Sequence, residues 1–393
     1  MTRDDPLEKY RDRFVGTDSD LVYFDGNSLG RPLKVTADRL RDFVLEQWGG
    51  RLIRGWHEEW LDLPLNLGDR IGRTCLGAAP GQVAVGDSTT VLLYKLMRAA
   101  VTARPGRTEI VIDRDNFPTD RYVADGVARE CGLELRWVDV DRTAGVTADL
   151  LAEAVSERTA LVVASHVAYR SAFMADGAEL TRVAHDAGAL FLWDLSHSGG
   201  SVPVELDAWG ADLAVGCTYK YLNGGPGSPA YCYVAARHLD SFTQPIQGWM
   251  GAQDPFLMGP VYAPTPGIRR FLSGTPSVTA MLAVGDMLDL VDEVGMAAVR
   301  EKSVRLTEHA IGLADEHLAG LGVTVASPRD AAWRGGHVTL HHPRMREVVE
   351  ALWTRDVIPD YRDPGGLRVG LSPLSTSYDE VDRGIAALRE LLA

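Results

Sequence analysis

The sequence has few cysteines, a deficit of basic residues and no long apolar run. Four cysteines among 393 residues, none in a CxxC pair, argue against a disulfide framework and a structural zinc site. Forty Lys and Arg against 54 Asp and Glu give a formal charge of -14, which does not suit binding to nucleic acid or an anionic membrane. No apolar stretch approaches the ~20 residues of a membrane helix, and the charged N-terminus has no signal-peptide core. We expect a cytoplasmic protein that binds no metal, nucleic acid or membrane.

The middle of the sequence alternates strand-like and helix-like segments. With 46% apolar and 24% charged residues, the composition is that of an ordinary globular protein. The strand-like segments are Glu109–Asp113, Glu134–Val140, Ala160–Ser165, Ala189–Asp194, Asp212–Cys217 and Tyr231–Ala235. Continuous apolar strands separated by helices predict a buried, mostly parallel sheet, and such sheets bind ligands at the carboxyl ends of their strands.

This pattern breaks near Pro255–Ser277, where Gly and Pro are frequent and periodicity is lost. Shorter strands and helices follow, the last helix at Tyr378–Leu392, and they indicate a smaller α+β lobe. We expect three parts. Residues 1–50 form an N-terminal arm that joins the smaller lobe or reaches a partner, residues 51–277 form a large domain, and residues 278–393 form a small C-terminal domain.

Asp194 and Lys220 each follow the end of an apolar strand, and the two strands are consecutive. Because parallel strands end at one edge of a sheet, both side chains are expected at that edge. Pyridoxal phosphate needs a lysine amine for its Schiff base and a carboxylate against its pyridinium nitrogen. Taken alone, the pair also fits a turn-capping Asp and a solvated Lys.

Two further segments favour pyridoxal phosphate. Gly86–Thr90 offers hydroxyls and free backbone N–H groups before a helix-like run, which suits a phosphate, although an ordinary N-cap would look the same. Asn116–Asp120 follows a strand and offers an aromatic face beside a carboxylate, although a core Phe with a capping residue would too. The sequence contains, in this order, a phosphate site, an aromatic ring, a carboxylate and a lysine. The combination favours pyridoxal phosphate more strongly than any one of these features alone.

Motifs along nearly the whole chain resemble the kynureninase family. They are DSTT, NFPTD, WDLSHSGG, CTYKYLNGGPG, YFDGNSLG, LIRGW, QGWMG, SGTPS and RVGLSPL. Kynureninases are homodimeric pyridoxal-phosphate enzymes of the aspartate-aminotransferase fold (fold type I) that hydrolyse the Cβ–Cγ bond of L-kynurenine to anthranilate and L-alanine. The resemblance implies an α/β fold, with a mostly parallel seven-stranded sheet in a large cofactor-binding domain and a smaller α+β C-terminal domain.

The resemblance also implies roles for the residues around the cofactor ring. Lys220 would bind pyridoxal phosphate covalently and move the substrate α-proton. Asp194 would pair with the pyridinium nitrogen, and His197 would lie beside it. Phe117 would stack on the ring, with Asp120 close by.

The same resemblance assigns the phosphate and substrate contacts. The residues that would hold the phosphate are Thr89, Thr90 and Tyr219, with Trp249 and Thr275 from the partner chain. Tyr219 would also donate a proton during cleavage. Arg368 would grip the substrate α-carboxylate, because a planar guanidinium binds a carboxylate through two N–H groups. Asn27 and Ser28, in the GNSLG stretch, would lie near the substrate.

Positions that border the family's aryl pocket depart from its usual pattern. Met250 follows the Gly-Trp pair where an aromatic residue is usual, and Ala252 lies where a His would be expected soon after. Ser375 stands in place of a Tyr, and His57 where Asn is common. Because these changes remove a ring and a hydrogen-bond donor, we hypothesise that the substrate is a ring-modified kynurenine or another γ-keto amino acid.

Other functions remain open at this point. Another pyridoxal-phosphate chemistry on the same fold would be an aminotransferase, a lyase or a cysteine desulfurase. A desulfurase needs a mobile catalytic Cys, and none of the four cysteines lies in an obvious Gly-rich exposed loop. A non-enzymatic homologue is opposed by the presence of Lys220, Asp194 and Arg368 together.

Overall fold

The larger sheet of the computed structural model, which describes residues 5–393, has seven strands in the order β2-β8-β7-β6-β5-β3-β4. The strands are β2 (Val83–Val85), β3 (Glu109–Asp113), β4 (Glu134–Val138), β5 (Thr159–Ser165), β6 (Leu190–Asp194), β7 (Leu213–Gly216) and β8 (Tyr231–Val234). β3 to β7 pair in parallel, whereas β8 is antiparallel to both β2 and β7. The predicted α/β class with a mostly parallel seven-stranded sheet is confirmed.

Both faces of this sheet are covered, which explains the continuous apolar strands. In β5, Leu161 and Val163 pack into one core, and Val162 and Ala164 pack into the other. Helices α4 (Thr89–Thr102) and α5 (Pro118–Cys131) cover the first face. The second face is covered by α3 (Leu63–Ile71), α6 (Ala148–Ala154), α7 (Gly177–Asp186) and α8 (Val278–Val294). Each fully buried aliphatic side chain stabilises the fold by roughly 1.5–3 kcal/mol.

Side-chain caps set where several of these helices begin. Ser88, Thr147 and Asp176 precede α4, α6 and α7, and their side-chain oxygens accept a backbone N–H of the first turn. Pro118 begins α5, where its missing N–H costs nothing. Since α4 and α5 follow strands directly, their N-termini lie at the carboxyl edge of the sheet.

A second sheet has four strands in the order β12-β13-β10-β9. These strands are β9 (Thr324–Val325), β10 (His337–His341), β12 (Asp360–Arg362) and β13 (Gly366–Gly370). Helices α9 (Met296–His317), α10 (Met345–Trp353) and α11 (Tyr378–Leu392) pack with it around a separate apolar cluster. The N-terminal strand β1 (Val22–Tyr23) pairs in parallel with β11 (Val357–Ile358) beside this cluster. This part of the chain is α+β, as expected.

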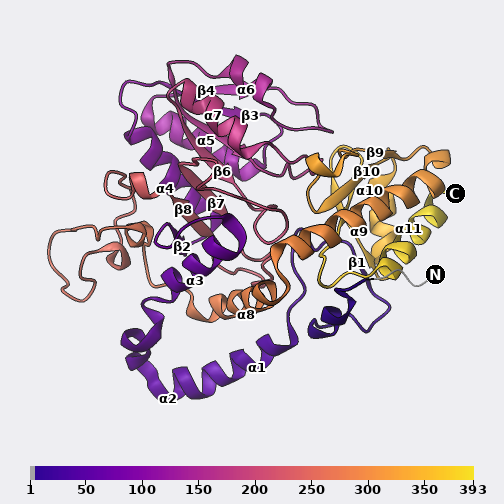
Figure 1. Ribbon diagram of the computed structural model, residues 1–393, viewed down its shortest axis with the longest axis horizontal. Coiled ribbons are helices and arrows are strands. Elements are labelled where there is room, and N and C mark those ends of the chain that lie inside the picture. The colour runs from indigo at the N-terminus through magenta and orange to yellow at the C-terminus, as the bar shows by residue number, and fades with distance from the viewer. Residues whose placement is uncertain (1–4) are drawn as a thin grey trace.

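The N-terminal helices α1 (Lys34–Asp42) and α2 (Gly49–Arg51) form an arm that runs below α8 and the large sheet in the view of Figure 1. The division of the chain at residues 50 and 277 stays a prediction, and residues 1–4 of the predicted arm lie outside the described residues. The helix after residue 277, α8, buries Met281 and Val284 in the core of the large sheet. Within residues 5–393, no helix is long and apolar enough to cross a membrane.

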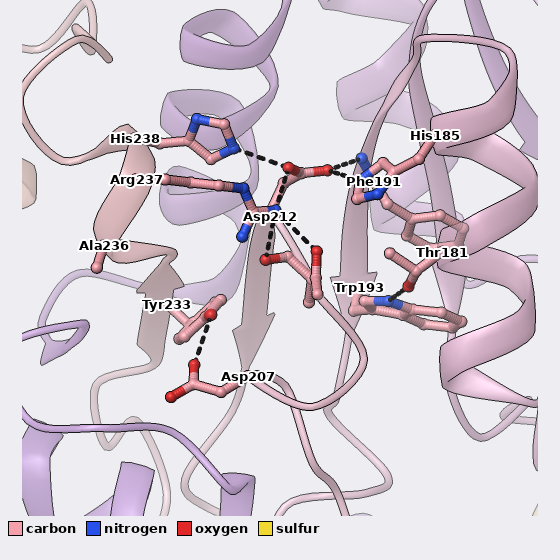
Figure 2. A network of polar contacts seen from close by, with 12 residues as sticks. Thr181, His185, Phe191, Trp193, Asp207, Asp212, Tyr233, Ala236, Arg237 and His238 are labelled. Atoms are coloured by element: carbon pink, nitrogen blue, oxygen red, sulfur yellow. Dashed lines mark hydrogen bonds and ion pairs between the residues drawn. The ribbon is translucent and has the colours of Figure 1, made fainter.

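A polar network ties together the edge of the large sheet at the start of β6 and β7 (Figure 2). The buried carboxylate of Asp212, next to the start of β7, accepts from His185 Nε2 at 2.8 Å, His238 Nε2 at 2.7 Å and Arg237 Nη2 at 2.6 Å. The backbone N–H of Phe191 also donates to it, at 2.8 Å. These contacts hold the pKa of Asp212 below its usual range despite burial. The network joins α7, β6, β7 and the turn after β8.

Candidate active site

The side chains of Lys220 and His197 meet at the carboxyl edge of the large sheet. Lys220 lies in the loop after β7 and His197 in the turn after β6, and Lys220 Nζ is 3.1 Å from His197 Nε2. The same amine lies 5.8 Å from the centroid of the Phe117 ring, and Tyr169 packs edge-on against that ring at 5.3 Å. The structure therefore brings together the amine, the imidazole and the aromatic ring that were expected around the cofactor.

Buried carboxyl groups lie beside this amine. Asp194 ends β6, Asp120 lies in the first turn of α5, and Asp113 ends β3. Burial, followed by the Asp194 charge, raises the pKa of Asp120 well above its usual range. Burial also raises the pKa of Asp113 to about 7. The site therefore favours the neutral form of the Asp120 carboxyl beside Asp194.

These carboxyl groups fit the ring nitrogen of pyridoxal phosphate. Asp194 Oδ1 accepts the backbone N–H of Ser196 at 2.8 Å, which fixes its orientation. The Oδ2 atom of Asp120 is buried and has no hydrogen-bond partner in the described part of the chain. A buried carboxyl group with an unpaired oxygen is stabilised by a positively charged donor, and the protonated ring nitrogen of pyridoxal phosphate is such a donor.

His197 is a neutral imidazole. Burial lowers its pKa well below the usual value, and the charges of Lys220 and Arg368 lower it further. Its Nε2 can therefore accept a hydrogen bond from the Lys220 ammonium. The His337 ring on β10 packs 5.5 Å away, so His197 is confined on the side of the smaller sheet. His197 holds the amine in position at the edge of the sheet.

His166, which follows β5, belongs to the core. Burial lowers its pKa to about 3, and its Nδ1 lies 2.9 Å from the hydroxyl of Ser198. Its ring packs against Trp193 and Trp209 at centroid distances of 6.0 and 4.9 Å. These contacts explain His166 as a structural residue, whereas Tyr169 supports the Phe117 ring.

A cavity of about 400 Å³ lies at the start of α4. Its wall includes Asp87, Ser88, Thr89, Thr90, Tyr219, Ser228, Ser273 and Thr275. The hydroxyls and the N-terminal backbone N–H groups of α4 suit a phosphate dianion. Thr89, Thr90 and Tyr219 thus line one cavity, as the sequence predicted. Thr275 of the same chain lines it too, although the resemblance implied that this residue comes from a partner.

A buried lysine below this cavity was not anticipated from the sequence. Lys95 Nζ donates to Asp87 Oδ2 at 2.5 Å and to the carbonyl of Phe271 at 2.7 Å, and the side chain is fully buried. Ser273 Oγ donates to the same Asp87 oxygen at 3.2 Å. Lys95 therefore neutralises the one carboxylate at the cavity and ties it to the segment that leads to Thr275.

Trp249 and the altered aryl-pocket positions lie away from this cavity. The Trp249 ring packs edge-on against Phe256 at 6.1 Å, and Phe256 packs against His57 at 4.7 Å. Met250 is fully buried in the apolar core of the large sheet. Ser375 is buried, and its carbonyl accepts from Arg11 Nε at 3.3 Å. In this chain Met250 therefore fills core volume.

Arg368 and Ser28 form a second group, on the smaller sheet. Arg368 on β13 is only 1% exposed, and its Nη2 donates to Ser28 Oγ at 2.9 Å. Asn27 is fully buried with no side-chain partner among residues 5–393, and it packs so closely on Gly370 that a Cβ there would meet Asn27 Oδ1 at 1.9 Å. The structure thus joins Arg368 to Ser28, while Asn27 fits against the backbone of β13.

Two carboxyl groups around Arg368 were also missed. Asp360 on β12 pairs with the guanidinium, and burial raises the pKa of the nearby Asp25 carboxyl to about 6. The DGNSLG stretch contains Asp25, but nothing local marks it as a neighbour of Arg368. No cluster of His, Cys, Asp and Glu in the described ranges could hold a metal ion.

The fold and this site together define a pyridoxal-phosphate-dependent enzyme of fold type I. A cysteine desulfurase from Thermococcus onnurineus superposes with a TM-score of 0.83 and 19% identity, covering 100% of this chain and 99% of that one. A C-DES variant with glycine covalently linked to its PLP cofactor gives 0.83 and 18%, covering 97% and 99%. At these identities the similarity shows the fold alone.

Sequence comparison gives the family. A kynureninase from Burkholderia pseudomallei is 42% identical over 399 residues, which cover 100% of this chain and 94% of the relative. The kynureninase of Pseudomonas fluorescens is 42% identical over 396 residues, covering 99% and 93%. The model of the kynureninase C-terminal domain matches residues 299–388. The chain therefore belongs to the kynureninase family, hydrolases of carbon–carbon bonds in ketonic substances that use pyridoxal phosphate.

Proposed function

We propose that this protein uses pyridoxal phosphate to hydrolyse the Cβ–Cγ bond of L-kynurenine, giving anthranilate and L-alanine. The observation that carries the proposal is that Lys220, in contact with His197, and Asp194 lie at one edge of the sheet in a chain that is 42% identical to kynureninases over its full length. An aminotransferase, a lyase or a desulfurase is not favoured, because the desulfurase of the same fold is only 19% identical.

The residues at the sheet edge supply the contacts that the cofactor requires. Bound pyridoxal phosphate withdraws electrons from the substrate Cα. Asp194, with the Asp120 carboxyl beside it, holds the proton on the ring nitrogen. Phe117 stacks on the ring and is itself held by Tyr169. The phosphate is held by Thr89, Thr90 and Tyr219.

Two side chains move protons in the proposed reaction. Lys220 binds the cofactor covalently and takes the α-proton, and neutral His197, 3.1 Å away, keeps its amine in place. Burial raises the pKa of the Tyr219 phenol, so the phenol keeps its proton at neutral pH and can deliver it to the carbon that leaves as alanine. Loss of either proton-transfer group should lower the rate on the order of 10²–10⁴-fold.

Arg368 binds the substrate α-carboxylate in this proposal. Its guanidinium is buried, so a carboxylate that reaches it exchanges water for charge-assisted hydrogen bonds in a low-dielectric site. Ser28, which contacts Nη2 at 2.9 Å, can yield that N–H to the ligand.

The enzyme acts as a homodimer in the cytoplasm in this proposal. The exposed apolar residues on the arm are Val35, Leu40, Val44, Leu45, Trp48, Leu52 and Ile53, and those on the loop at 256–261 are Phe256, Leu257, Met258 and Val261. Figure 1 shows the arm and this loop projecting from the body of the protein. Apolar surface of this extent is typical of an obligate interface, which would also let Trp249 reach the partner's phosphate site. Sedimentation of the holoenzyme, with Ile53→Asp as a monomer-promoting variant, tests the dimer.

The substrate test uses purified protein loaded with pyridoxal phosphate. We expect L-kynurenine to yield anthranilate, seen by its fluorescence, and L-alanine in equal amounts, and Lys220→Ala to yield neither. Comparing kcat/KM for kynurenine, ring-hydroxylated or methylated kynurenines and aliphatic γ-keto amino acids tests the substrate hypothesis. Conversion of the cofactor to its amine form by kynurenine, without anthranilate, would establish an aminotransferase instead.

A further inference from the structure

We propose that Asp360 is a positioning residue for substrate recognition: its carboxylate fixes the Arg368 guanidinium in the orientation that receives the substrate α-carboxylate. The proposal rests on the proposed function, in which Arg368 binds that group. Asp360 lies one strand away from Arg368 and is not expected to touch the substrate.

The register of the smaller sheet creates this pair. β12 and β13 are antiparallel, and Asp360 lies directly opposite Arg368. Arg368 Nε donates to Asp360 Oδ2 at 2.7 Å, and Arg368 Nη2 contacts the same oxygen. Because both donors lie on one edge of the guanidinium, the carboxylate sets the plane of the group as well as its place.

Two further contacts hold the rest of the guanidinium. Arg368 Nη1 donates to the carbonyl of Tyr169 at 2.8 Å, and Nη2 donates to Ser28 Oγ at 2.9 Å. The Tyr169 carbonyl belongs to the residue that supports the Phe117 ring. The guanidinium is therefore held at a fixed place relative to the Phe117 ring, on which the cofactor would stack. The Ser28 contact is the only neutral side-chain contact of the three, so it is the one an incoming carboxylate can replace.

Charge explains why a carboxylate is needed at position 360. Arg362 Nη2 also lies 3.0 Å from Asp360 Oδ2, so one carboxylate serves two guanidinium groups. These three groups together are positive, and the nearby Asp25 carboxyl, whose pKa burial raises to about 6, offsets only part of that charge when a substrate carboxylate approaches. Without Asp360, Arg362 and Arg368 would repel each other across the hairpin, and the buried Arg368 would lose its only ion-pair partner in the described chain.

The effect of Asp360 should appear in substrate binding. Asp360 and the substrate carboxylate have the same charge and would repel each other in direct contact. Asp360 therefore affects substrate binding through Arg368. The contact between Arg368 and the substrate is present both before and during the reaction, and its weakening raises KM more than it lowers kcat.

The experiment compares Asp360→Asn with Asp363→Asn in the loaded enzyme. Asp363 lies in the same hairpin but is exposed and pairs with Arg346 at 2.9 Å, so it controls for local disturbance. We expect D360N to raise KM for kynurenine about 10–100-fold, the size of a lost charged hydrogen bond, with kcat within about threefold. D363N should leave both constants unchanged.

A second measurement separates positioning from a structural role. Titration of the loaded protein with L-alanine and with ethylamine, its decarboxylated counterpart, followed by cofactor absorption, compares ligands with and without the α-carboxylate. D360N should lose affinity for alanine only. Its thermal midpoint should fall because a buried ion pair is lost, so both ligands are titrated well below that midpoint, where the cofactor absorption of the free enzyme matches the wild type. Equal loss for both ligands, or an unchanged KM, would overturn the proposal. If the wild-type protein cleaves no kynurenine, the proposed function fails, and the alanine preference still tests Asp360.

Discussion

The Nζ atom of Lys220 lies 3.1 Å from Nε2 of His197, and burial keeps this histidine neutral. The imidazole can therefore accept from the amine but adds no positive charge beside it. Because the Phe117 ring lies 5.8 Å from the same amine, His197 and Phe117 fix its position from two sides.

The first prediction concerns this contact. His197→Phe keeps a ring in the site but removes the acceptor, so the Lys220 amine loses its orientation. We expect kcat to fall about 10²-fold, the cost of misplacing a reacting group by about 1 Å. The cofactor should still be bound, as its absorption will show. His317→Phe on α9 is the matched control, and an unchanged kcat in H197F would contradict the assigned role.

The second prediction separates the two adjacent carboxyl groups. Burial and the Asp194 charge raise the pKa of Asp120, so the neutral amide of Asp120→Asn resembles the form of this carboxyl that the site favours. We expect kcat in D120N within about tenfold of the wild type. Asp194→Asn removes the ionised partner of the ring nitrogen and should lower kcat on the order of 10²–10³-fold. A larger loss of kcat in D120N than in D194N, measured by steady-state kinetics, would instead assign the ring nitrogen's partner to Asp120.

The third prediction concerns Lys95, which lies under the phosphate cavity. Lys95→Met leaves the Asp87 carboxylate unpaired beside the phosphate, and we expect the Kd for pyridoxal phosphate to rise about 10–100-fold. Breaking a buried pair costs about 3–5 kcal/mol, part of which appears as lost stability. The double variant with Asp87→Asn removes the repulsion and should recover affinity in a spectroscopic titration. No recovery would show that Lys95 acts through packing alone.

The fourth prediction concerns pH and the Asp212 network. Hydrogen bonds from His185 and His238 hold the pKa of Asp212 below its unfolded value of about 3.9. A depressed pKa contributes stability that is present above the unfolded value and is lost as the pH falls below it. Asp212→Asn should lower the free energy of unfolding by about 3 kcal/mol at pH 7.

The same variant should show a pH signature in denaturant unfolding. The difference from the wild type should shrink as the pH falls below about 4, because Asp212 then takes up a proton in the unfolded chain while it stays ionised in the folded one. Since the network lies at the opposite edge of the sheet from Lys220, kcat of the folded variant should be unchanged. A constant stability difference down to pH 2 would exclude the ionic origin of the effect.

Long periodic segments were predictable from the sequence. The strand Glu109–Asp113 and the helix Tyr378–Leu392 have the predicted bounds, and the predicted strand Ala189–Asp194 differs by one residue. The short strands β1, β11 and β12 were missed, because two or three residues carry no readable alternation. In the antiparallel hairpin that faces Asp360 with Arg368, β12 is one of these missed strands, whereas the sequence predicts β13 as a strand over Leu367–Gly370.

The sequence by itself determined the chemistry available to this protein: a lysine, carboxylates, an aromatic ring and hydroxyls in an order that matches one family, on segments whose apolar periodicity sets the strands and helices. Only the tertiary structure decided which charges face one another. It placed Asp120 against Asp194, Lys95 under Asp87 and Asp360 across from Arg368. Periodicity is a local property of the chain, whereas a charge pair depends on strand register and on the low dielectric of a buried site, which exist only once distant segments have packed.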